Sequence, residues 1–212
     1  MSAFTILLLL FGFGYHYVYN FLDGTGAFCT ENSALNLSND GFEVAGNLRK
    51  KEFIFDTATD KACISTGVYV RTFKSYNIKV TREGAEWTFL DEPSYMGGQP
   101  ISHLPWYKGI YMAAMFPLRR TLDRPWGAIV LRVGSKGNEE DFLDRDPPAQ
   151  SDDIRDDPKE YAIDKFEVLE ENVRPKRDGE LFIYLNKPIR PLLWFTGWIG
   201  NTGTAKVAIS YR

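Results

Sequence analysis

The chain has 212 residues, a formal net charge of -3 and an aromatic content of 15%. This length is sufficient for one domain with a sizeable core and an appendage. The acidic balance gives no overall positive field, so we expect no nucleic-acid partner. The many Phe, Tyr and Trp residues favour a β-rich domain, because flat side chains pack well on pleated, half-buried surfaces.

The N-terminal segment, residues 4–22, contains no charged residue. As a helix it would rise about 28 Å, close to the roughly 30 Å thickness of a bilayer's hydrocarbon core. Tyr15, Tyr17 and Tyr19 gather at its end, where aromatic rings favour the headgroup level. We therefore expect residues 1–22 to form an uncleaved transmembrane anchor. The alternatives are a buried core segment and a cleaved signal peptide, for which the basic start and the small cleavage-site residues are missing.

The flank that follows predicts that the folded domain lies outside the cytoplasm. No Lys or Arg occurs between Asp23 and Leu48, whereas cytoplasmic flanks normally carry an excess of them. Cys29 and Cys63 are the only cysteines. An even number of cysteines is consistent with one disulfide in an oxidising compartment. It is almost equally consistent with two buried free thiols. We expect an inner-membrane anchor with the domain in the periplasm, or an otherwise extracytoplasmic domain.

Residues 23–41 are rich in Gly, Ser, Thr and Asn and predict a linker, so the folded domain covers residues 42–212. The strand-like runs of this domain are "KEFIFDT", "ACISTGVYV", "SYNIKVTR", "WGAIVLRVG", "YAIDKFEVLEE", "GELFIYLN" and "TAKVAISYR". The short link "RTFK" predicts a hairpin, and "IYMAAMF" fits a helical turn or a short strand. About eight strands without a clear amphipathic helix predict an all-β protein, an antiparallel β-sandwich.

An acidic loop, residues 135–160, interrupts the strand pattern. Its carboxylates lack the D-x-[DN]-x-[DN]-G spacing with which one short loop surrounds a calcium ion. Pro147, Pro148 and Pro158 favour an extended conformation. We expect this loop to be a solvated excursion rather than a metal site.

Motifs that mark an enzyme are missing from the sequence. There is no G-x-S-x-G nucleophile elbow, no Walker loop, no H-E-x-x-H pair and no cysteine pair at zinc spacing. His103 is the one histidine outside the apolar N-terminal segment, and a lone loop histidine is more often a surface residue than a general base. Carboxylate pairs stay open, because a sequence does not show which acids meet in space. We expect a protein that is not an enzyme.

The loop before the last strand is rich in aromatic residues. Trp194, Phe195 and Trp198 occur close to Asn201 and Thr202. The apolar faces of sugars stack on aromatic rings, and their hydroxyls need hydrogen-bond donors and acceptors. This combination therefore fits a saccharide site. A protein-binding surface and a plug over the end of the core fit these residue types equally well.

Four stretches of the domain carry a resemblance to a known family. They are "STGVYVRTFKSYNIKV", which Trp87 follows, "WGAIVLRVGSKG", "DGELFIYLN" and "GNTGTAKVAIS". Together they cover most of residues 63–212 and resemble the bacterial calcium-dependent galactose lectins and their lectin-like, galactose-binding-like relatives. The resemblance implies a jelly-roll-like β-sandwich. Related domains also occur as accessory modules of larger bacterial proteins, including some that resemble secreted lipase effectors.

In that family a calcium ion beside the last loop bridges the protein to two sugar hydroxyls. The resemblance implies that its Asp ligand corresponds to Lys187, next to Asn186, and that its two successive Asn ligands correspond to Gly200 and Asn201. A carbonyl ligand would fall near Leu90. A positive charge about 4 Å from the ion would repel it by several kcal/mol at an effective dielectric constant of about 20, and calcium usually takes carboxylate ligands. We therefore expect no calcium and no other cofactor.

Two functions follow from these features. The first is a membrane-anchored, lectin-like module that binds a saccharide or another polar envelope component without calcium. The second is a protein-binding module on the same fold, such as a tethered inhibitor or immunity-type partner of a secreted enzyme. The candidate ligand-binding residues are Trp87, Asn186, Lys187, Trp194, Phe195, Thr196, Trp198, Asn201 and Thr202.

Overall fold

The computed structural model describes part of the chain. The described residues are 10–11, 14–15, 17–19, 21–22, 25–26, 28–30, 42–56, 63–89, 92–93, 104–114, 126–135, 140–142, 168–187 and 201–212. Most of them lie in antiparallel strands, which confirms the prediction of an all-β fold. The division into an anchor, a linker and a domain stays a prediction, because residues 31–41 lie outside this set.

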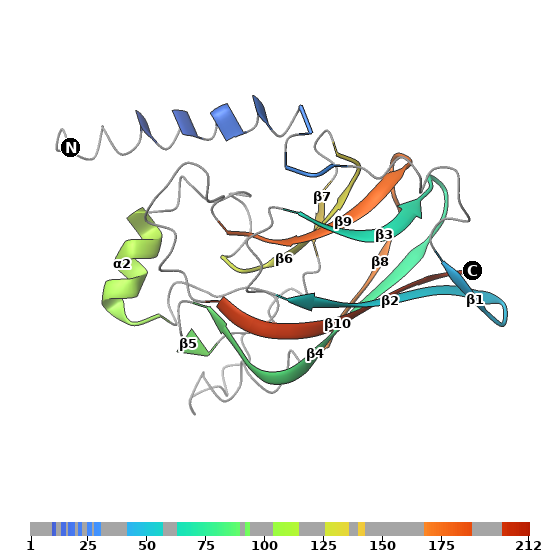
Figure 1. Ribbon diagram of the computed structural model, residues 1–212. Coiled ribbons are helices and arrows are strands. Elements are labelled where there is room, and N and C mark those ends of the chain that lie inside the picture. Colours follow the sequence, from blue (N-terminus) through green and yellow to red (C-terminus); the bar gives the residue numbers. More distant parts are fainter. Residues whose placement is uncertain are drawn as a thin grey trace, which may run out of the picture.

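The strands form two antiparallel sheets (Figure 1). The first sheet contains β1 (Glu43–Ala45), β2 (Leu48–Asp56), β10 (Asn201–Tyr211), β4 (Tyr76–Phe89) and β5 (Glu92–Pro93) in this order, and β8 (Val168–Val173) pairs with β4. The second sheet has the order β3 (Ile64–Val70), β9 (Gly179–Leu185), β6 (Ile129–Val133) and β7 (Glu140–Phe142). A helix, α2 (Trp106–Ala114), stands at one end of the molecule in Figure 1.

One hydrophobic cluster contains side chains from both sheets. In β10 the side chains of Ala205, Val207 and Ile209 are buried, whereas those between them are partly exposed. This alternation arises because successive side chains of a strand point to opposite faces of the sheet. In β4, Ile78 and Val80 follow the same pattern. The apolar alternation in the sequence therefore selects the faces that meet in the core.

The second sheet is buried on both faces in its central strands. All seven residues of β9 are buried. Ile183 belongs to the central cluster, whereas Phe182 and Tyr184 are buried outside it. Arg132 of β6 is also fully buried, and its guanidinium donates hydrogen bonds to the carbonyl oxygens of Gly134, at 3.3 Å, and Ser135, at 2.8 Å. A buried charge needs such partners, because desolvation otherwise costs several kcal/mol.

The N-terminal segment is joined to the domain by a disulfide between Cys29 and Cys63, with 5.3 Å between their Cα atoms. Tyr15 and Tyr19 are buried, and the ring of Tyr19 stacks on Phe28 with 5.0 Å between centroids. The structure therefore contains the disulfide and not the two free thiols that the sequence also allowed. In the part of the chain that the structure describes, no helix is both long and apolar enough to cross a bilayer.

The predicted hairpin at "RTFK" is wrong. β3 pairs with β9 in the second sheet, and β4 pairs with β10 and β8 in the first sheet, so the link connects the two sheets. Val70 and Tyr76, which flank the link, are both in the core cluster. Each strand therefore gains its neighbours from distant parts of the chain while its apolar face still points toward the core.

Three other runs can be compared with the structure. The run "IYMAAMF" lies largely in the helix α2, so its helical alternative is confirmed and the short strand is wrong. Within α2, Met112 is fully buried while Trp106 and Ile110 are exposed, which is a helical rather than a strand-like alternation. The acidic loop, residues 135–160, contains the short strand β7, which pairs with β6. The strand β8 covers the end of "YAIDKFEVLEE" and extends past it to Val173, and the earlier residues of this run lie outside the described part of the chain.

Candidate functional site

The candidate site lies where β9 and β4 end and β10 begins. Asn201, the first residue of β10, pairs with Phe89, and the ring of Phe89 lies against Gly127. The backbone N–H of Gly127 donates to the carbonyl oxygen of Asn186 at 3.0 Å. These contacts connect Asn186 and Asn201 through the ends of the two sheets. Two of the candidate residues are therefore brought to the same end of the fold (Figure 1).

Asn201 carries the most informative polar atom of this region. Its side chain is 8% exposed, and its Oδ1 atom has no hydrogen-bond partner within the described part of the chain. A buried carbonyl oxygen without a donor costs about 1–3 kcal/mol. Such atoms are uncommon in folded proteins and call for a physical explanation. A ligand that donates a hydrogen bond to Oδ1 would remove this cost.

A pair of hydroxyl groups lies beside Asn201 on the outer side of the sheet. The Oγ1 atoms of Thr88 and Thr202 are 2.9 Å apart, and the backbone N–H of Thr202 donates to Oγ1 of Thr88 at 3.2 Å. Thr202 is exposed. The sequence predicted Thr202 but missed Thr88, because their proximity depends on the strand register, which a single sequence does not show.

Asn186 and Lys187 form the turn that leaves β9. The backbone N–H of Asn186 donates to the carbonyl oxygen of Ala128 at 2.8 Å, and that of Lys187 donates to the carbonyl oxygen of Leu185 at 2.8 Å. Asn186 is fully buried, whereas Lys187 is partly exposed. The arrangement gives Asn186 a supporting position, and Lys187 is the residue of the two that solvent reaches.

Trp87 is buried in the core rather than exposed to a ligand. Its side chain is 2% exposed and belongs to the hydrophobic cluster. A Cβ atom placed on Gly203 would lie 2.9 Å from the ring of Trp87, and Gly203 has a φ of 139°. Both observations require glycine at this position. The register of β10 against β4 shifts at this point, between Thr202 and Thr204. Trp87 therefore fixes the irregularity that positions the start of β10.

Trp194, Phe195, Thr196 and Trp198 lie outside the described residues, as does His103. Whether the aromatic loop contacts a ligand, contacts a protein or covers the core stays open as the sequence left it. The described part of the site consists of Asn186, Lys187, Thr202, Thr88 and Asn201, with Trp87 beneath it.

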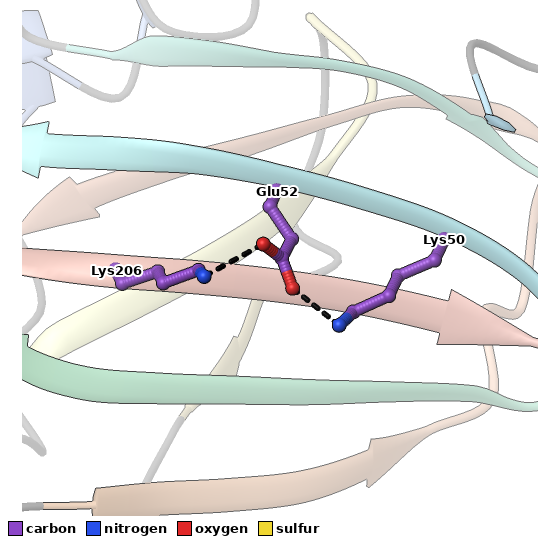
Figure 2. Close-up of polar contacts among 3 residues, drawn as sticks. All are labelled: Lys50, Glu52 and Lys206. Atoms are coloured by element: carbon purple, nitrogen blue, oxygen red, sulfur yellow. Dashed lines mark ion pairs between the residues drawn. The ribbon is translucent and has the colours of Figure 1, made fainter.

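The outer face of the first sheet carries a separate group of charges, shown in Figure 2. The carboxylate of Glu52 pairs with Lys206 of β10, at 2.7 Å, and with Lys50 of its own strand. The hydrogen bond from Lys206, followed by that from Lys50, lowers the pKa of Glu52 from its ordinary 4.5 to about 2. The group connects β2 to β10 and lies on an exposed sheet face, so we assign it a structural role.

Replacing Glu52 by Gln should therefore make stability less dependent on pH. Because the pKa of Glu52 is lower in the folded state, its stabilising contribution is complete above pH 4.5 and is lost as the pH falls toward 2. We expect the melting temperature of the wild type to exceed that of Glu52→Gln slightly at pH 7, and the difference to disappear by pH 2. Added salt should reduce the difference at pH 7, because the pair is exposed. A difference that persists unchanged at pH 2 would contradict this account.

Comparison of the chain with protein-family models, with curated proteins and with solved structures finds no match. The described site contains amide and hydroxyl groups at the surface end of an apolar core, and a cation at its edge. Such groups can donate and accept hydrogen bonds to a polar ligand.

Proposed function

We propose that the protein is a membrane-anchored, extracytoplasmic binding domain with a jelly-roll-like β-sandwich fold. Its ligand is a saccharide or another hydroxyl-rich envelope component, bound without calcium and without catalysis. The observation that carries the proposal is the buried Oδ1 atom of Asn201, which has no hydrogen-bond partner among the described residues. Asn201 occupies the one position of the calcium-binding Asn pair that the lectin resemblance retains.

A hydroxyl group is the ligand chemistry that fits this oxygen best. A carbonyl oxygen accepts a hydrogen bond, and a sugar hydroxyl can donate one while accepting another from a neighbouring group. Lys187 could supply such a donor at the edge of the site. The hydroxyl of Thr202 lies on the opposite, outer face of β10. Lys187 stands at the position of the metal-binding Asp, so its ammonium group would contact a ligand oxygen directly instead of through an ion.

Membrane attachment is supported by the exposed side chains of the N-terminal segment. The described helical residues with exposed apolar side chains are Leu10, Phe11, Tyr17, Val18 and Phe21. They repeat at intervals of three, four and seven residues and therefore share one face of the helix. Exposed apolar side chains on one face of a segment without charges favour contact with lipid.

A protein-binding function has one observation in its favour. Helix α2 exposes Trp106 by 78%, Tyr107 by 55% and Ile110 by 63%, and it stands at the end of the molecule where β9 ends and β10 begins (Figure 1). Exposed aromatic side chains are typical anchors of protein interfaces. A tethered inhibitor or immunity-type partner of a secreted enzyme is therefore the second candidate.

The variant Asn201→Leu tests the proposed function. Leu has nearly the shape of Asn but no polar atom, so the variant removes Oδ1, which has no hydrogen-bond partner among the described residues. We expect the ligand-free variant to be more stable than the wild type by about 1 kcal/mol, which corresponds to a rise in melting temperature of roughly 2–4 °C. On a glycan array in the presence of EDTA, the wild type should bind a restricted set of glycans and the variant none of them.

Two controls make this test specific. Glu52→Gln lies on the outer face of the first sheet and should leave glycan binding unchanged. Trp106→Ala removes the largest exposed side chain of α2 and should also leave it unchanged. If Trp106→Ala abolishes capture of a protein while neither the wild type nor Asn201→Leu binds any glycan, the protein-binding function replaces the proposed one.

A further inference from the structure

The links that follow β3 and β8 are in contact at the end of the molecule opposite the candidate site. β10 runs from Asn201 at the site to Tyr211, which pairs with Tyr76, the residue directly after the β3–β4 link. The backbone N–H and the hydroxyl of Thr72 donate to Oδ1 of Asp178, at 2.6 and 2.7 Å. Residues 71–75 and 174–178 therefore form one surface, here called the tip.

Phe73 projects from the tip into solvent. Its side chain is 98% exposed, and its φ of 68° is the only positive value among the described residues other than glycine. The backbone N–H of Lys74 donates to the carbonyl oxygen of Arg71 at 3.3 Å, so Phe73 is the third residue of a β-turn. Glycine or asparagine normally occupies that position when φ is positive. A bulky side chain in this conformation costs free energy and is a reason to look for a function.

The turn is held in this conformation by its surroundings. Besides the two hydrogen bonds of Thr72, the backbone N–H of Arg71 donates to the hydroxyl of Tyr76 at 2.8 Å. The hydrogen bonds from Thr72 lower the pKa of Asp178, so this carboxylate is ionised at neutral pH and accepts both bonds. Phe73 is therefore presented by a fixed turn and has no packing role in the fold.

The tip is strongly cationic in a chain whose net charge is negative. The chain carries a formal charge of -3. The charged residues of the tip are Arg71, Lys74, Arg174, Lys176, Arg177 and Asp178. Five cations against one carboxylate give a formal charge of +4 on ten residues. The guanidinium of Arg177 donates to the carbonyl oxygen of Val133 at 2.8 Å, so the exposed cations of the tip are the other four.

We propose that the tip binds an anionic lipid surface, with Phe73 inserted at the level between headgroups and acyl chains and the four exposed cations in contact with the headgroups. Basic clusters are attracted to anionic leaflets, and a single aromatic ring is readily accepted at the bilayer interface. A protein interface needs a larger continuous apolar area than one ring. The inference rests on the membrane placement in the proposed function and is independent of the ligand of Asn201.

The full-length variant Phe73→Trp, reconstituted in vesicles, tests the position of the tip. Vesicles contain either phosphatidylcholine alone or phosphatidylcholine with phosphatidylserine, each with lipids brominated near the headgroup end of the acyl chains. After subtraction of the wild-type emission, we expect the added indole to shift to shorter wavelength and to lose fluorescence only in the anionic vesicles. High salt, or the additional changes Lys74→Glu and Lys176→Glu, should restore the fluorescence.

Two further variants serve as controls. Ile54→Trp places the reporter at an exposed position of β2, on the outer face of the first sheet, and should not be quenched. Phe73→Gly suits the positive φ, so its melting temperature should exceed that of the wild type. A lower melting temperature for Phe73→Gly would show that the ring serves the fold and would overturn the proposal.

The remaining outcomes separate this proposal from the proposed function. If the full-length Phe73→Trp variant floats with vesicles but its added indole is not quenched, the membrane placement stands and the tip proposal fails. If the protein does not float at all, both fail. Equal quenching in neutral and anionic vesicles, or equal quenching of the Ile54→Trp reporter, would also overturn the proposal. So would a spectral shift of the Phe73→Trp reporter with single-stranded RNA or an acidic peptide but not with anionic vesicles.

Discussion

Replacement of both Cys29 and Cys63 by Ser is expected to lower the free energy of unfolding by about 3–4 kcal/mol. The disulfide joins residues separated by 34 positions, and the loss of loop-closure entropy in the unfolded chain gives about this value for a loop of that length. The melting temperature should fall by roughly 10 °C. Urea unfolding of the wild type and the double variant measures the difference.

Reducing agent provides the matched control for this variant. A reductant should lower the free energy of unfolding of the wild type to that of the double variant and leave the variant itself unchanged. The disulfide also holds Tyr19 and Phe28 close to the second sheet, so limited proteolysis should cut the segment around Phe28 sooner in the variant. Equal stability of wild type and variant under oxidising conditions would show that the cysteines are not paired.

Replacement of Trp87 by Ala should have an effect of similar size, about 3–5 kcal/mol, because it removes a large buried side chain from the core. Trp87 is 2% exposed and its ring contacts Gly203 at the register shift of β10. The cavity would therefore lie directly beneath Asn201 and Thr202. We expect the variant to lose both stability and ligand binding, with the loss of stability visible in the absence of any ligand.

Trp106→Ala is the appropriate comparison, because Trp106 is the same residue type with 78% of its side chain exposed. Its effect on the free energy of unfolding should stay within about 0.5 kcal/mol. If Trp87→Ala is equally mild while ligand binding is lost, Trp87 contacts the ligand and is not a core residue. That result would contradict the position of Trp87 described above.

The sequence predicts the strands well where one face of a strand is apolar. The alternation in β4 and β10 identifies the buried residues, for example Ile78 and Val207. The sequence also predicts β9, although the burial of every residue in that strand cannot be read from an alternation with a period of two. The pairing partners of a strand cannot be read from this alternation. The link 71–74 is short, but short links join strands of different sheets as easily as hairpin strands, so the hairpin prediction was wrong.

The candidate site was predictable only in part. The resemblance to lectins points to Asn201 and Lys187, but it does not reveal that Oδ1 of Asn201 is buried without a partner among the described residues. Thr88 could not be predicted because its proximity to Thr202 arises from the register of β4 and β10. Trp87 was predicted as a ligand-binding residue, yet an aromatic residue in a strand fits a core and a binding site equally well until its burial is known. Phe73 lacked any signal, because phenylalanine is not expected at a positive φ.

The central claim is that the end of the fold around Asn201 binds a polar ligand without calcium. A thermal melt of the wild-type protein with a panel of galactosides and envelope glycans, each in calcium and in EDTA, tests it most directly. A ligand that binds only the native state raises the melting temperature. We expect at least one glycan to raise it equally in both buffers, and calcium alone to have no effect. A shift that requires calcium would contradict the claim, because Lys187 and Gly200 would then not prevent metal binding.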